Sequence, residues 1–139
     1  MKNRVGGVIL SHGQMANELL AAAETVLGAI EGIAAVSIGW HDDVEIARAE
    51  LERAISAVER GKGVLLLTDL FGGTTTNIAA MFHTAGKIEI LTGVNLPMVV
   101  KLVQQDEAAD LTEIARQVLQ AGREGIYLAG ELLAPLKNK

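Results

Sequence analysis

The chain has 139 residues, half of them hydrophobic, and carries a net charge of −5 with a pI near 5.1. This length suits one domain better than two, and no basic run offers a footprint for a nucleic acid backbone. Cysteine is absent, which excludes disulfides, thiolate metal sites and cysteine nucleophiles. No apolar run approaches the length of a membrane span, and the short one near the N-terminus has no cleavage pattern, so we expect a cytoplasmic protein.

Strand-like and helix-like patterns alternate along the first half of the chain. Three apolar runs have the length and composition of buried strands, namely 5–10, 33–38 and 64–68. Between them, apolar residues recur at helical spacing over 14–27 and again over 44–58. Gly28 is a natural stop for the first helix, and Asp42 with Glu45 resembles an N-terminal capping pair for the second.

The second half of the chain continues the alternation. The predicted elements are a helix over 75–84, a strand over 88–92, a short helix over 97–104, a long helix from 111 to 122 and a final short strand over 126–128. Pro97 suits the first turn of the short helix, and Gly122 is expected to end the long one. This pattern predicts an α/β fold, a parallel sheet with helices on both faces. Residues 1–139 are expected to form one domain, with a core over about 5–128 and a short C-terminal tail.

Two predicted strands end in residues with reactive side chains. The first ends in Ser11-His12-Gly13, and the third ends at Asp69, followed by Gly72-Gly73 and the start of a helix. In open parallel sheets, functional sites lie beyond the carboxyl ends of the strands. If the strand order reverses after the second strand, the first and third strands become neighbours about 4.8 Å apart. His12 and Asp69 would then be close enough to form a hydrogen bond.

Such a pair has a recognisable chemistry. A carboxylate that accepts the imidazole Nδ1–H fixes the tautomer and leaves Nε2 with a free lone pair, as a base, a metal ligand or a nucleophile. No second histidine or carboxylate near His12 has ligand spacing, which argues against a metal site. Gly72 and Gly73 permit close backbone approach, Thr74 and Thr75 add hydroxyl donors, and the helix start favours an anion.

A nucleophilic nitrogen facing an anion site suits phosphoryl transfer through a phosphohistidine. The competing interpretation is a small nucleotide- or flavin-binding domain. It is weakened by the absence of a Gly-x-Gly-x-x-Gly fingerprint and by an aromatic content of only 3% for stacking on rings.

Four motifs carry a family resemblance, and they occur in order as Gly7-Val8-Ile9-Leu10-Ser11-His12-Gly13, Leu67-Thr68-Asp69-Leu70-Phe71-Gly72-Gly73-Thr74-Thr75-Thr76-Asn77, Gly93-Val94-Asn95-Leu96-Pro97-Met98 and Gly122-Arg123-Glu124-Gly125-Ile126. Together they resemble the IIA component of the mannose-type (mannose/fructose/sorbose) bacterial phosphotransferase system over about residues 5–128. The chain differs from better-known members at Phe71, where tryptophan is common, and at Thr74-Thr75, where Ser-Pro is usual. It also differs at 40–43, which reads Trp-His-Asp-Asp instead of a Pro-Gly-acid loop.

The resemblance implies a protein-histidine phosphotransferase that needs neither cofactor nor metal. His12 would accept a phosphoryl group on Nε2 from phospho-HPr and pass it to a IIB component. Asp69 would orient His12, and Gly72, Gly73 and Thr74 would hold the phosphoryl group. The chain would be a free-standing IIA protein that meets a membrane only indirectly, through a IIC/IID transporter.

The resemblance also implies a three-layer α/β/α fold. Its four parallel strands would follow the order 2-1-3-4, and a fifth, antiparallel strand, here 122–128, would be exchanged between the subunits of a homodimer. A IIA-like regulatory protein, whose phosphorylation state is sensed without sugar transport, is the alternative function. The phosphotransfer subunit of dihydroxyacetone kinase is a related alternative.

The motif residues also have structural interpretations. Asp69 could act only as a helix cap, and Gly72-Gly73 only as a tight turn. His41 and His83 are expected to be ordinary surface or helix residues, and Asn95 either shapes a turn or lines the site. The sequence does not indicate which sugar is involved, which IIB protein is the partner, or how tightly a dimer would form.

Overall fold

The structure, a computed structural model, describes residues 3–39 and 43–137, apart from the side chains of 135–137. Within this part the strands are β1 (Gly6–His12), β2 (Ile33–Ile38), β3 (Val64–Thr68) and β4 (Ile88–Leu91). The helices there are α1 (Met15–Leu27), α2 (Val44–Val58), α3 (Gly73–Ala80), α4 (Leu96–Val103), α5 (Leu111–Glu124) and α6 (Ala129–Lys137).

The strands form one sheet in the order β2-β1-β3-β4, and each neighbouring pair is parallel. β1 lies between β2 and β3, with Val8 opposite Ala34 on one side and Leu66 on the other. The prediction of four parallel strands in the order 2-1-3-4 is confirmed. Because β1 and β3 are neighbours, their carboxyl ends, which carry His12 and Asp69, lie side by side.

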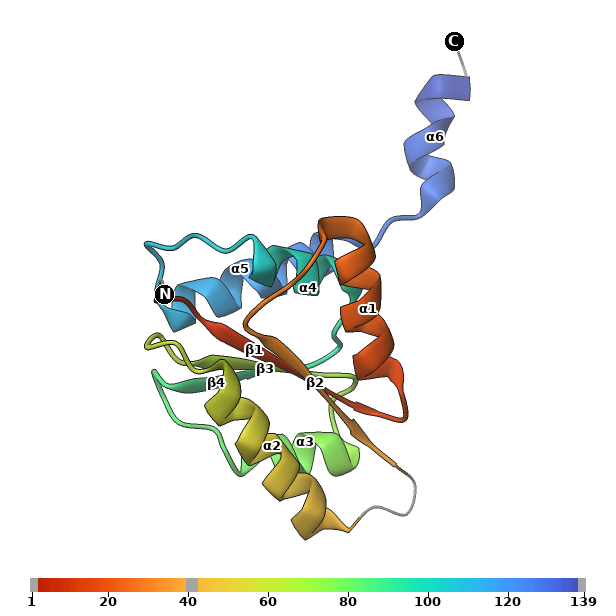
Figure 1. Cartoon of the computed structure of the whole chain (residues 1–139). Coiled ribbons are helices and arrows are strands. Elements are labelled where there is room, and N and C mark those ends of the chain that lie inside the picture. Colours follow the sequence, from red (N-terminus) through yellow and green to blue (C-terminus); the bar gives the residue numbers. More distant parts are fainter. Residues whose placement is uncertain (1–2, 40–42, 138–139) are drawn as a thin grey trace.

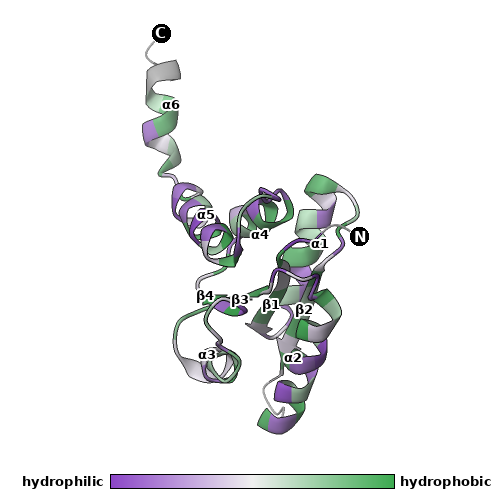
Figure 2. Ribbon diagram, turned by 90° about the vertical axis from the view of Figure 1, so that its left-hand side faces the viewer, coloured by the Kyte–Doolittle hydropathy of each residue, from purple (hydrophilic) through white to green (hydrophobic). Residues whose placement is uncertain are grey.

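Helices cover both faces of the sheet and enclose two apolar clusters. α1, α4 and α5 lie on one face, and α2 and α3 lie on the other, so the sheet is the middle of three layers (Figures 1 and 2). Alternation along the strands divides the core, because Ile9 and Leu67 join the first cluster whereas Leu10 and Leu66 join the second. β1 and β3 are therefore apolar on both faces, as expected for central parallel strands.

Polar side chains cap α2 and α5, and Asn95 supplies a further cap at α4. Asp110 and Glu113 form a complete capping box at the start of α5. At α2 the cap is Asp43, whose side chain accepts from the backbone N–H of Glu45 at 2.8 Å. The predicted cap Asp42 lies outside the described residues, and Asp43 is the cap that the structure contains.

Gly122 does not end the long helix, which corrects that prediction. α5 continues to Glu124, and Gly122 is buried inside it. A Cβ at Gly122 would lie 2.6 Å from Met98 Cγ, so the missing side chain lets α5 approach α4 closely. Asn95 joins the same two helices, because its Nδ2 donates to the Gly122 carbonyl at 3.0 Å.

The C-terminal segment also differs from the prediction. Residues 122–124 are helical, and 126–128 pair with no strand in the described part of the chain. Ile126, Tyr127 and Leu128 are 75%, 64% and 71% exposed. α6, which the sequence analysis did not predict, follows them and leads away from the other helices (Figure 1).

α3 is displaced relative to its prediction over 75–84. It begins at Gly73 and ends at Ala80. The amides of residues 81–83 bond to carbonyls only three residues earlier, which ends the α-helical pattern, and Thr84 then forms an isolated β-bridge with Ile88 at the start of β4. The helix therefore starts directly at the two glycines Gly72 and Gly73.

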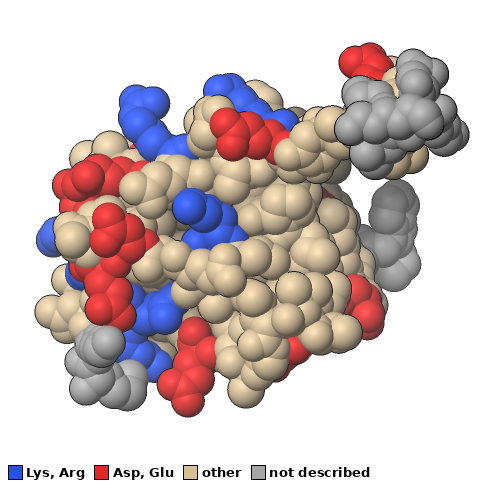
Figure 3. All heavy atoms as spheres, turned by 90° about the horizontal axis from the view of Figure 1, so that it is seen from above, with Lys and Arg blue, Asp and Glu red and all other residues tan. Residues whose placement is uncertain are grey.

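The surface carries charges of both signs. Seen from above, acidic and basic side chains are interspersed, and most of the uncharged area of this face lies toward the right of the view (Figure 3). Among the described helices, none is long and apolar enough to cross a bilayer.

Candidate functional site

His12 is the last residue of β1, and the chain around it is held on several sides. Its backbone N–H donates to Asp69 Oδ2 at 2.8 Å. The N–H of Gly13 donates to the Ile38 carbonyl at 2.9 Å. Before it, the buried Ser11 hydroxyl accepts from the N–H of Ala16 at 2.7 Å, at the start of α1. The position of the imidazole is therefore set by β2, α1 and the loop after β3.

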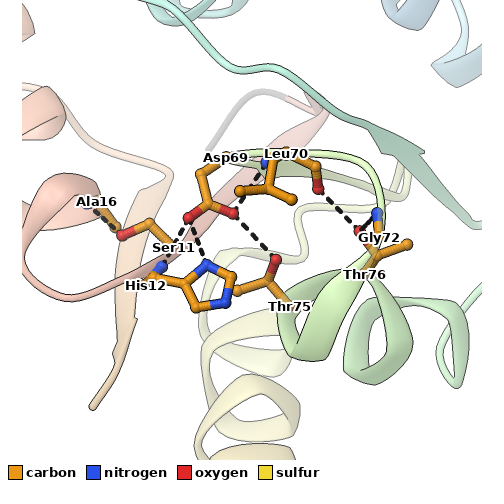
Figure 4. Close-up of polar contacts among 8 residues, drawn as sticks. All are labelled: Ser11, His12, Ala16, Asp69, Leu70, Gly72, Thr75 and Thr76. Atoms are coloured by element: carbon orange, nitrogen blue, oxygen red, sulfur yellow. Dashed lines mark hydrogen bonds and ion pairs between the residues drawn. The ribbon is translucent and has the colours of Figure 1, made fainter. Parts of the chain in front are cut away.

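Asp69 follows β3 and accepts four hydrogen bonds (Figure 4). Oδ2 accepts from His12 twice, from the backbone N–H and from the imidazole Nδ1 at 2.7 Å. Oδ1 accepts from the N–H of Leu70 at 2.9 Å and from the Thr75 hydroxyl at 3.0 Å. The His12 side chain is 48% exposed and the Asp69 side chain only 7%. The reactive ring faces solvent, and the carboxylate lies behind it.

The electrostatics of Asp69 favour a carboxylate. Burial raises the pKa of Asp69, but hydrogen bonds from the His12 backbone, the His12 ring and Thr75 lower it by more, so the pKa lies below its usual value. An ionised carboxylate only accepts hydrogen bonds. Nδ1 of His12 therefore carries the proton of the neutral ring, and Nε2 keeps a free lone pair.

Two glycines bring the start of α3 up to the imidazole. Gly72 and Gly73 have φ values of +99° and +79°, a conformation that other residues adopt only with strain. A Cβ at Gly73 would lie 4.0 Å from His12 Nε2. The first amides of an α-helix have no partner inside the helix, and the dipole makes this end positive. The free nitrogen of His12 therefore lies beside a place that suits an anion.

The threonines after the glycines divide into different roles. Thr76 braces the loop, since its hydroxyl accepts from the Gly72 N–H and donates to the Leu70 carbonyl, each at 2.9 Å. Thr74 is exposed, whereas Thr75 is fully buried and points to Asp69. The sequence pattern predicted the same hydroxyl role for Thr74 and Thr75 and no role for Thr76. Hydroxyl residues in a first helical turn often bond to nearby backbone, which was the available signal for Thr76.

Asp69 does not cap α3. The residue at the cap position is Gly72, and no side chain caps the helix there. The interpretation of Asp69 as only a helix cap is therefore wrong. Its carboxylate is directed at His12 instead.

The other residues of uncertain role have different hydrogen-bond or ion-pair partners wherever the structure describes them. His83 lies beyond α3, with Nε2 3.5 Å from Glu89 Oε1. Asn95 caps α4, accepting from the N–H of Met98 at 3.1 Å. His41 lies outside the described residues. In the described part of the chain, no group of three histidine or acidic side chains could hold a metal ion.

Large exposed apolar side chains lie close in the chain to His12 and Asp69. Leu70 and Phe71, from the loop that holds His12, are 49% and 82% exposed. Met15, at the start of α1, is 42% exposed. An open reactive nitrogen with apolar neighbours suits a reaction between two protein surfaces more than the capture of an enclosed small molecule.

Comparison with known proteins identifies a family with this fold. The family described as "EIIA-man: PTS system fructose IIA component" matches residues 6–119. The mannose-specific EIIAB component of Escherichia coli is 34% identical over 126 residues, which cover 86% of this chain. The chain spans only 38% of that protein's length. The fructose-specific EIIA component of Bacillus subtilis is 23% identical, with 94% of this chain and 90% of that protein covered.

Solved structures agree with this comparison. A mannose/sorbose-specific IIA subunit from Enterococcus faecalis superposes with a TM-score of 0.77 at 29% identity, covering 89% of this chain and 93% of the other. The component EIIA from Streptococcus agalactiae gives a TM-score of 0.79 at 26% identity, covering 88% and 95%.

Proposed function

The chain belongs to the EIIA-man family, the IIA phosphocarriers of the mannose-type phosphotransferase system, and we propose that His12 is the residue that carries its phosphoryl group. The observation behind the proposal is the Nδ1–Asp69 hydrogen bond of 2.7 Å, which leaves Nε2 as a free, exposed nucleophile. Phospho-HPr is the proposed donor, and a IIB component is the proposed acceptor.

The transfer step balances on these residues alone. The Nε2 lone pair attacks the phosphorus of the donor phosphohistidine, an N–P bond forms, and the bond to the donor nitrogen breaks with its electron pair. Because Nδ1 keeps its proton, positive charge develops on the His12 ring. The Asp69 carboxylate stabilises that charge at 2.7 Å. In the transfer to IIB, the new N–P bond breaks and its electron pair returns to Nε2. The His12 ring is then neutral again, with its proton still on Nδ1 beside Asp69.

The start of α3 is the proposed holder of the phosphoryl oxygens. Gly73 lies next to Nε2, and its amide and that of Thr74 belong to the unpaired first turn. The exposed Thr74 hydroxyl adds a further donor. Gly72 contributes through its conformation, because its own N–H is bonded to Thr76.

The exposed surroundings of His12 support protein partners. Leu70 and Phe71 follow Asp69 in the chain and Met15 follows His12 by three positions, and these exposed apolar side chains are the proposed docking surface for HPr and a IIB protein in turn. We place this reaction in the cytoplasm, where the proposed donor and acceptor meet. A membrane enters only through a IIC/IID transporter that receives the phosphoryl group from IIB.

We further propose that the protein, one domain per chain, is a homodimer in which residues 126–128 extend the sheet of a second copy. Two features support this. The outer edge of β4 pairs with no strand of the described chain, and an open edge favours strand addition. The apolar segment 126–128 is exposed in its own chain. Antiparallel pairing of residues 126–128 of one copy with the β4 edge of the other would bury the apolar segment and satisfy the open edge.

The proposed acceptor is tested with enzyme I, HPr and phosphoenolpyruvate, followed by intact mass measurement and tests with acid and base. We expect one phosphoryl group, labile in acid and stable in base. His12→Ala should abolish it, whereas His41→Ala and His83→Ala should keep it. Chase with a mannose-type IIB protein should then remove it. Labelling that persists in His12→Ala would refute His12 as the acceptor.

A further inference from the structure

Thr75 has a contact that the transfer step above does not use. Its hydroxyl donates to Asp69 Oδ1 at 3.0 Å, and its side chain is fully buried. The other donors to this carboxylate belong to His12 and to Leu70, next to Asp69 in the chain. Thr75 lies in the first turn of α3, so its hydroxyl joins this helix to the carboxylate (Figure 4).

We propose that Thr75 is a positioning residue for phosphoryl transfer: its hydroxyl holds the Asp69 carboxylate in the orientation that presents His12 Nε2 to the start of α3. The proposal rests on His12 as the phosphoryl acceptor. The Thr75 hydroxyl is bonded to Asp69, and Thr75 acts on the ring through that carboxylate.

The geometry of the carboxylate explains why one hydroxyl matters. The two oxygens of a carboxylate offer about four acceptor sites, and here four donors occupy them. Without the Thr75 hydroxyl, the N–H of Leu70 is the remaining donor to Oδ1. Because Leu70 is next to Asp69 in the chain, this N–H moves with the carboxylate and does not fix its orientation. A largely buried carboxylate would lose a charge-assisted hydrogen bond, and little water can replace it. The carboxylate plane, and with it the imidazole, is then less well fixed.

The same helical turn serves both parts of the site. Gly73 lies beside Nε2, and Thr75, two residues later, holds the residue behind Nδ1. Thr75 therefore sets the distance between the proposed phosphoryl-holding amides and the nucleophile. Proline, the usual residue at this position in the resembling family motif, has no hydroxyl, so this bond belongs to the present sequence.

The test compares two substitutions at Thr75. Thr75→Val keeps the shape of the side chain and removes the hydroxyl, whereas Thr75→Ser keeps the hydroxyl. Thr68→Val is the matched control, because Thr68 is also fully buried near the site but its hydroxyl has no partner among the described residues. Rates of phosphoryl gain from phospho-HPr are measured by rapid quench across pH 5–9 (roughly the range in which histidine loses its proton).

Because Thr75 acts on the rate only through Asp69, we expect less than the full effect of a lost bond to a charged group, a rate about 3- to 10-fold lower in Thr75→Val. Thr75→Ser and Thr68→Val should remain near the wild-type rate. In the unphosphorylated protein, carbon NMR should find the pKa of Asp69 higher in Thr75→Val than in wild type, and nitrogen NMR should find a less uniform His12 tautomer. These NMR readings do not depend on phosphorylation, so they separate this proposal from the assignment of His12.

Wild-type rate and unchanged Asp69 titration in a folded Thr75→Val variant would overturn the proposal. If Thr75→Val does not fold, Thr75→Ala takes its place. Should both fail to fold while Thr75→Ser folds, the hydroxyl serves the fold and the proposal is likewise overturned.

Discussion

One oxygen of Asp69 binds two donors of His12. Oδ2 accepts the backbone N–H at 2.8 Å and the ring Nδ1–H at 2.7 Å. The orientation of the imidazole is thereby tied to the end of its own strand, and a neutral amide cannot reproduce this arrangement. An asparagine at position 69 presents either an oxygen that carries no charge or a nitrogen that donates, which opposes the His12 backbone N–H and favours the other tautomer of the ring.

Asp69→Asn should therefore slow transfer from phospho-HPr by at least about 10-fold while the protein stays folded, because the charge that stabilises the ring is lost. Rapid-quench transfer rates in both directions measure the effect. Asp43→Asn is the matched control, since Asp43 is a genuine helix cap and asparagine caps equally well. Equal rates in the two variants would contradict the role of Asp69.

Acid should remove the contribution of Asp69 to stability. The pKa of Asp69 is lower in the folded state than in the unfolded chain, so the ionised form favours folding. The contribution is complete above the unfolded-state value of about 3.9 and is lost as the pH falls through the lower folded value. We expect the difference in unfolding free energy between wild type and Asp69→Asn to be constant from neutral pH to about 5 and to shrink below about 4. Urea denaturation at each pH measures it, and a difference that grows in acid would contradict the prediction.

Gly122→Ala should destabilise the protein, by about 1 to 2 kcal/mol, because overpacking against Met98 outweighs the better helix propensity of alanine. Gly130→Ala in α6 is the control, since a Cβ there meets nothing within 4 Å. That change should be neutral or slightly stabilising. Chemical denaturation compares the two. A more stable Gly122→Ala would mean that Met98 moves aside at little cost.

Removal of residues 126–139 should abolish the proposed dimer and leave a monomer or an aggregate. The cut falls after Gly125 because α5 continues to Glu124. Removal of 135–139 alone should change little. Light scattering of both truncated chains and of the full chain measures the outcome. A full-length monomer at micromolar concentration would rule out strand exchange.

The sheet and the reactive pair could be predicted because both depend on long-range regularities. Apolar runs of strand length alternate with helical periodicity, and right-handed crossovers leave few arrangements. Once β1 and β3 are neighbours, a residue just after each strand must lie near the other. His12 and Asp69 follow from that.

Details that depend on single close contacts could not be predicted. A glycine near the end of a helical pattern can either end the helix or allow another element to pack closely against it. Gly122 does the latter, because Met98 occupies the space that a side chain would need. The start of α3 depends on two consecutive glycines with positive φ, and sequence patterns do not specify that conformation. Thr74, Thr75 and Thr76 have different roles because their side chains leave the helix in different directions. Thr75 faces Asp69, Thr76 faces the loop before the helix, and Thr74 is exposed. The side chains described in α6, those of residues 129–134, are all exposed, so this part of the helix has no packing against the domain that the sequence pattern could have reflected.

The anchoring of Ser11, His12 and Gly13 has a consequence for how two proteins meet. Ser11 is hydrogen-bonded to the start of α1, His12 to Asp69 after β3, and Gly13 to the end of β2. These bonds restrict movement of residues 11–13 toward a partner. In the transfer proposed above, the donor would therefore bring its phosphoryl group to a nitrogen held in place, and any adjustment on docking would fall to the donor or to the exposed Phe71. On this proposal the protein would offer a rigid acceptor, and the conformational adjustment of each exchange would occur in its partners.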